Sequence, residues 1–132
     1  MKIYKKDNKI LSIVYKNDDW EQGLNFITPN ELYIQVGSWW YNKGKKLASH
    51  THKEFERIAT RTQEMTYVKK GSMRVLLYDD DHNYIEDYIL SEGDTAIFAY
   101  GGHGYEILED GTQVIEAKNG PFIDVDTDKT KF

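Results

Sequence analysis

The chain has 132 residues, which is long enough for one domain with a sizeable core. Its 17 Lys and Arg residues against 22 Asp and Glu residues give a net charge of −5, which argues against nucleic acid or an anionic membrane as the main partner. Because no cysteine occurs, disulfides, zinc–thiolate sites and thiol nucleophiles are excluded.

The first ten residues, MKIYKKDNKI, are basic but contain no long apolar run. We therefore expect neither a signal peptide nor a membrane span, and we expect the protein to be cytoplasmic.

The rest of the chain consists of short apolar runs separated by turns, and its aromatic content is 14%. Such runs are typical of β-strands, and no sustained 3.6-residue apolar period is present. The predicted strands span residues 9–17, 31–42, 64–70, 72–79, 84–90, 94–100, 105–109 and 112–118. The pattern predicts one all-β domain over residues 1–132, either a sandwich or a closed barrel, with a loop or one helical turn at 17–26 and a polar surface tail at 121–132.

Two of the four histidines, His50 and His52, lie two residues apart next to a predicted strand. Residues i and i+2 of a strand point to the same face. The spacing therefore suits two ligands of one metal ion, or a paired acid and base.

The segment from Gly44 resembles the first motif of the cupin family. That motif has Gly, five residues, His-X-His, three or four residues, Glu, six residues and Gly. Its front half matches Gly44 to His52, and its back half matches Glu64 to Gly71. The stretch 93–108 resembles the second cupin motif, with His103 near the position of the family's histidine. The core motifs thus span residues 44–107, and the resemblance implies an antiparallel jelly-roll β-barrel.

The chain departs from the family pattern in the spacing between its halves. Eleven residues separate His52 from Glu64, Ala99 replaces the usual proline, and no asparagine follows His103 at the expected distance. Two glutamates therefore compete for one position, because Glu56 has the short spacing from His52 and Glu64 has the spacing to Gly71. We favour Glu64 because it lies in a clear β-run, whereas Glu56 lies in a segment that looks like a loop.

The resemblance implies a metal site made of His50, His52, Glu64 and His103. Neutral imidazoles and a carboxylate suit a divalent ion such as zinc, iron, manganese or nickel, and such a set leaves open coordination positions for a substrate. Each residue also has an ordinary interpretation: a hydrogen-bonded histidine pair, a turn histidine at His103 and an edge charge at Glu64.

The function implied by the resemblance is that of a metal-dependent enzyme acting on a small polar metabolite. A carbohydrate or sugar nucleotide is the expected substrate, and isomerase or epimerase chemistry is the expected reaction, with dioxygenase chemistry as another. Two alternatives remain open: a non-catalytic ligand-binding or sensing barrel, and a metal-free sugar-nucleotide ketoisomerase that uses His50 or His52 to shuttle protons. We also expect a homodimer, since several strands carry large apolar side chains on both faces.

Overall fold

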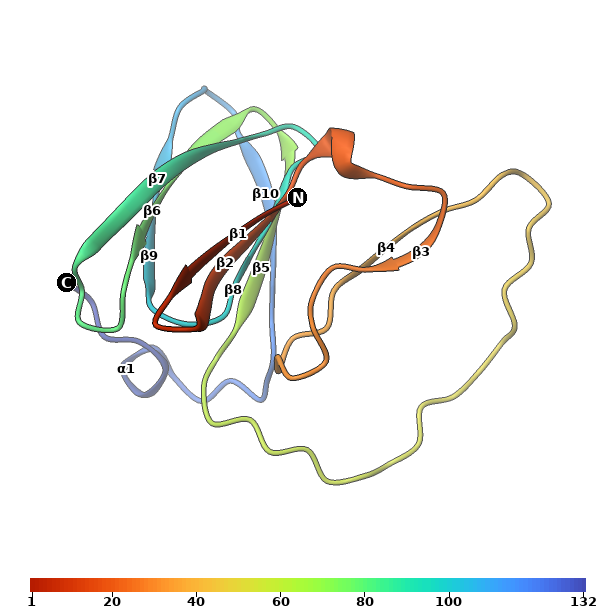
Figure 1. Ribbon diagram of the computed structural model, residues 1–132, viewed down its shortest axis with the longest axis horizontal. Helices are drawn as coiled ribbons and strands as arrows, with labels where there is room; N and C mark the ends of the chain where they lie inside the picture. The colour runs from red at the N-terminus through yellow and green to blue at the C-terminus, as the bar shows by residue number, and fades with distance from the viewer.

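The computed structural model describes residues 1–132 and is built mostly of antiparallel β-strands (Figure 1). The strands are β1 (Lys2–Lys6), β2 (Lys9–Tyr15), β3 (Gly23–Phe26), β4 (Gly37–Trp40), β5 (Glu64–Lys70), β6 (Ser72–Tyr78), β7 (Tyr84–Ser91), β8 (Thr95–Phe98), β9 (Gly102–Ile107) and β10 (Gln113–Lys118). The helices are a 3-10 turn at Asn17–Asp19 and α1 (Val125–Asp128). No helix is long and apolar enough to cross a membrane.

The strands form three sheets, of which two face each other. The larger has the order β1-β2-β8-β5-β10, and the smaller has the order β7-β6-β9. The hairpin β3-β4 forms a separate two-stranded sheet beside them. Both outer strands of the smaller sheet, β7 and β9, have a free edge.

The main core lies between the two larger sheets. Side chains from alternate positions of the strands meet there, and Val68, Val75, Leu77 and Leu90 are fully buried. A strand with one buried face needs this two-residue alternation, which β5 and β6 show clearly in their burial patterns.

A second apolar cluster contains residues of β2 and β8, including Ile13 and Ile97, together with Ile27 and Leu32 from the connection between β3 and β4. Because β2 and β8 contribute to both clusters, their residues are buried on both sides, which explains their nearly continuous apolar sequences.

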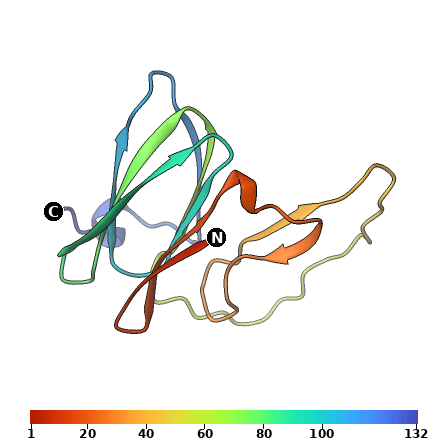
Figure 2. The same ribbon diagram turned by 45° about the horizontal axis from the view of Figure 1, so that its top comes forward.

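The chain between β4 and β5 forms a long arm, which we define as residues 42–61. Every residue of the arm is exposed, and none is in a strand or helix. Both views show the arm passing in a wide arc away from the sheets (Figures 1 and 2). Structureless connections of this length are uncommon in compact domains.

The strand predicted at 9–17 is confirmed as β2, and each strand predicted after residue 63 is present. The prediction for 105–109 began too late, because β9 starts at Gly102 and includes His103. The prediction for 31–42 was too long, because only Gly37–Trp40 is a strand; the preceding residues instead pack against the larger sheet. We missed β1, whose lysines hide the alternation around the buried Tyr4, and β3, which lies in the segment predicted as a loop. The tail at 121–132, predicted as a polar surface segment, includes α1, and its last residue packs on the domain, since the ring of Phe132 stacks on His82 with centroids 3.9 Å apart.

Candidate functional site

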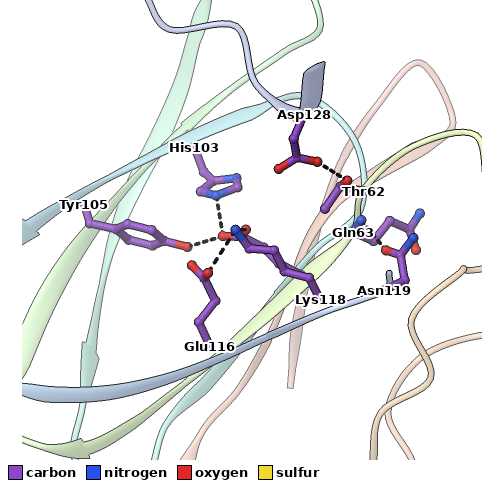
Figure 3. Close-up of polar contacts among 9 residues, drawn as sticks. Thr62, Gln63, His103, Tyr105, Glu116, Lys118, Asn119 and Asp128 are labelled. Carbon is purple, nitrogen blue, oxygen red and sulfur yellow. Dashed lines mark hydrogen bonds and ion pairs between the residues drawn. The ribbon is translucent and has the colours of Figure 1, made fainter. Parts of the chain in front are cut away.

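The candidate site lies where the first residue of β5 faces β9 across the space between the two larger sheets. In the larger sheet, Glu64 pairs with Phe98 of β8 on one side and with Lys118 of β10 on the other. From the smaller sheet, His103 and Tyr105 project from β9 on one face because they are two residues apart. Figure 3 shows His103, Tyr105 and Lys118 converging on one point.

The carboxylate of Glu64 is the centre of this cluster. Its Oε1 lies 2.7 Å from Nε2 of His103 and accepts a hydrogen bond of 2.8 Å from the hydroxyl of Tyr105. Its Oε2 lies 3.3 Å from Nζ of Lys118, which also pairs with Glu116 at 2.9 Å. The side chain of Glu64 is only 4% exposed, so these partners replace the water that a carboxylate would otherwise bind.

The pKa of Glu64 reflects this balance. Burial by itself raises the pKa of the carboxyl, but hydrogen bonds and charge from His103, Tyr105 and Lys118 outweigh burial and lower the pKa to about 2. Glu64 is therefore a buried anion at neutral pH. In contrast, burial and the neighbouring carboxylate raise the pKa of Tyr105 well above its usual value, so its hydroxyl stays protonated and donates.

An ionised Glu64 fixes the orientation of the His103 ring. Because the carboxylate only accepts hydrogen bonds, Nε2 of His103 must carry the proton that lies between them. In the neutral ring, Nδ1 then has the free lone pair. The ring also stacks on Phe98, with centroids 4.1 Å apart and planes 22° from parallel. Two contacts thus hold one tautomer in one orientation.

The turn before His103 depends on Gly101. This residue has φ +72°, and a Cβ there would lie 2.2 Å from the backbone oxygen of Tyr78. Its N–H donates to Asp80, which also pairs with Arg61 at 2.8 Å and with Lys9 at 3.0 Å. Burial raises the pKa of Asp80, but these donors outweigh it and lower the pKa to about 2. An anionic Asp80 therefore secures the start of β9.

A cavity of about 790 Å³ opens beside the cluster. Its volume is in the range of pockets that hold small metabolites. The wall includes Glu64, Phe98, His103 and Tyr105, and the chain from Asp128 to Phe132 borders it on another side. The polar cluster is thus accessible to a bound molecule.

Comparison of the chain with models of protein families, with curated proteins and with solved structures finds no match.

The four residues predicted to form a metal site are brought together only in part. Glu64 and His103 are in contact, whereas His50 and His52 lie on the exposed arm. The two arm histidines do lie close to each other, with ring centroids 5.2 Å apart, although their segment is not a strand. Glu56 is also on the arm and exposed. No group of three or more His, Asp and Glu side chains could hold a metal ion.

Sequence reasoning did not identify the roles of Tyr105, Lys118 and Phe98. Tyr105 could have been found from its position two residues after His103, because the same strand face carries both. Lys118 and Phe98 could not, since their contacts depend on the registers of β10 and β8 against β5.

Proposed function

We propose that this chain is an enzyme that moves a proton on a small polar metabolite, with His103 as the general base. A carbohydrate or sugar nucleotide is the expected substrate class, and isomerisation or epimerisation is the expected reaction. The observation that carries the proposal is the contact between Nε2 of His103 and the buried, ionised Glu64 at the wall of a cavity.

Each residue of the cluster has a distinct part in this chemistry. Nδ1 of His103 takes a proton from a carbon beside the substrate carbonyl, and the resulting imidazolium is stabilised by the Glu64 carboxylate. In an isomerisation, the former carbonyl oxygen takes the proton of the neighbouring hydroxyl, and the imidazolium returns its proton to the former carbonyl carbon on the same face, which regenerates the neutral ring. In an epimerisation, water on the opposite face supplies the proton, and the imidazolium releases its own proton to solvent. Tyr105 and Lys118 keep Glu64 ionised and in place, and so act as positioning residues.

The cupin resemblance also implies a divalent metal ion, which would supply a Lewis acid for the carbonyl. Catalytic metal sites usually have three protein ligands. Of the four predicted ligands, only Glu64 and His103 line the cavity, because His50 and His52 lie on the arm, and no three His, Asp or Glu side chains of the chain are grouped to hold a metal ion. The residues as placed do not fit a metal ion, and none of the proposed steps involves one.

We also infer that the two larger sheets are a jelly roll of the cupin type. Supporting this inference, they face each other across one core, and consecutive strands pass from one sheet to the other: β5 to β6, β7 to β8 and β9 to β10. If each sheet of the jelly roll has at least four strands, the smaller sheet of this chain, β7-β6-β9, lacks one strand.

The proposal is tested by deuterium incorporation. The protein is incubated in D₂O with a panel of reducing sugars and nucleotide sugars, and carbon-bound deuterium is measured by mass spectrometry. We expect exchange with at least one class of substrate, and we expect His103→Gln to reduce it by at least ~100-fold, the lower range for general base catalysis. Exchange that persists in His103→Gln would contradict the proposal. Binding of a sugar without any exchange would identify a binding module instead.

A further inference from the structure

The free edge of β9 and the exposed arm are complementary features of the same chain. β9 is the last strand of its sheet, so one of its edges has unpaired backbone groups. The arm has unpaired backbone groups as well: residues 46–62 form no backbone–backbone hydrogen bond. An extended segment can add a strand to a free sheet edge, in antiparallel or parallel orientation. The unpaired backbone N–H and C=O groups of the edge and of the segment then form hydrogen bonds with each other.

The sequence of the arm fits an edge strand at this position. If residues 48–53 are extended, Ala48, His50 and His52 share one face, and Ser49, Thr51 and Lys53 share the other. The second face is polar and ends in a lysine, as is common for an exposed outer strand. The first face would then lie beside His103 and Tyr105, on the side of the cavity.

The arm and the remainder of the chain have opposite net charges. Residues 42–61 contain six Lys and Arg and two Glu, whereas the remainder contains eleven Lys and Arg and twenty Asp and Glu. Near the free edge, Glu109 and Asp110 after β9 are exposed acidic residues, and Glu106 of β9 is exposed as well but pairs with Arg74 at 2.8 Å. A basic strand is therefore attracted to this edge.

We propose that the arm pairs with β9 of a second copy of the chain, so that two protomers exchange arms and each completes the cavity wall of the other. In both views the arm leads away from its own β9 (Figures 1 and 2). The neighbouring hairpin exposes Leu24, Phe26, Trp39 and Trp40, and the arm exposes Leu47, Phe55 and Ile58.

Exchange accounts for these apolar side chains better than a return of the arm to its own β9. The loop of the hairpin packs against the larger sheet, but part of the hairpin itself is uncovered, since Phe26 is 74% exposed. In the proposed exchange, we expect the second copy that takes up the arm to pack against the hairpin from which the arm emerges, whereas a return of the arm to its own β9 supplies no such partner. Exchange of identical elements is a common route to two-fold dimers.

The exchange deepens the proposed function, because it brings His50 and His52 of one protomer to the cavity that holds Glu64 and His103 of the other. The chemical role of His50 and His52 in the exchanged dimer rests on the proposed function. The pairing itself can be tested without any activity.

The test is chemical cross-linking of introduced cysteines. Because the chain has no cysteine of its own, every cross-link forms between introduced residues. Thr51 and Glu106 are both exposed, and they would lie on the outer face of the exchanged pair. The double variant Thr51→Cys/Glu106→Cys is treated with two bismaleimides of different length. The longer reagent still joins the two cysteines if the arm pairs with β9 one residue pair out of the expected register. Each single variant is the control.

We expect a product of twice the chain mass in the double variant, with a linked pair of peptides containing positions 51 and 106. The yield should fall at high salt, because the attraction between the arm and the edge is electrostatic. A linked pair of peptides within one chain would overturn the exchange in favour of a return of the arm. Absence of any link between positions 51 and 106, together with a monomeric mass in sedimentation, would overturn it as well.

Discussion

Nε2 of His103 lies 2.7 Å from Oε1 of Glu64, and this contact joins the two facing sheets at the wall of the cavity. Glu64 comes from the first residue of β5 and His103 from the second residue of β9. The pair is therefore both a tie between sheets and the centre of the proposed chemistry.

Removing the charge of Glu64 should destabilise the fold. In Glu64→Gln, Lys118 and His103 lose an anionic partner in a buried place, and we expect the free energy of unfolding to fall by about 2–4 kcal/mol. Urea denaturation measures this change. The matched control is Glu56→Gln on the exposed arm, which should change stability by less than about 0.5 kcal/mol. Equal effects of the two changes would contradict the burial of Glu64.

Acid should weaken the protein partly through this carboxylate. The pKa of Glu64 is about 2 in the folded state, against about 4.5 for an unperturbed Glu. A lowered folded-state pKa gives stability that is complete above roughly pH 4.5 and is lost as the pH falls toward 2. We expect a loss of about 2 kcal/mol from Glu64 between pH 6 and pH 3.

This acid dependence is measured as the difference in unfolding free energy between the two pH values. The difference should be smaller in Glu64→Gln than in the unchanged protein, because Gln does not titrate. If both proteins lose the same stability in acid, Glu64 has no lowered pKa.

The turn into β9 should tolerate no side chain at Gly101. Gly101→Ala combines φ +72° with a Cβ 2.2 Å from the oxygen of Tyr78, whereas Gly111 has the same φ and nothing within 4 Å of its Cβ position. We expect Gly111→Ala to cost about 1 kcal/mol of stability from backbone strain, and Gly101→Ala to cost at least about 2 kcal/mol more. Thermal denaturation of both variants provides the comparison; similar losses would show that the turn can move away from Tyr78.

The core between the sheets should depend on one face of β7. Leu90 is fully buried, while its neighbour Ile89 is 48% exposed on the opposite face. Leu90→Ala should cost about 2–5 kcal/mol because it leaves a cavity, and Ile89→Ala should cost less than about 1 kcal/mol. Chemical denaturation of the two variants tests the face assignment, and a reversed order would place the core on the wrong side of β7.

The sequence predicted the antiparallel β character and most strands, because burial on one face imposes a two-residue alternation that is visible in β5 and β6. It could not predict the free edge of β9 or the path of the arm. His50 and His52 were expected to share a strand face, but a strand also needs a neighbour, and pairing across sheets is not encoded locally.

The same limit applies to the candidate site. Glu64 and His103 were predicted together from motif spacing, and they are in contact. Lys118 was not predicted, since a lysine near a strand end has many ordinary surface roles, and only the register of β10 against β5 brings it to Glu64.

Nitrogen NMR of the imidazole rings at neutral pH shows which ring nitrogen of His103 carries the proton. The chain has only four histidines, so the signal of His103 can be assigned by comparison with His103→Gln. We expect neutral His103 to carry its proton on Nε2, directed at Glu64, with Nδ1 unprotonated, and we expect Glu64→Gln to weaken this preference. A His103 ring protonated on Nδ1 with a bare Nε2, unchanged in Glu64→Gln, would show that Glu64 does not orient His103 as a base.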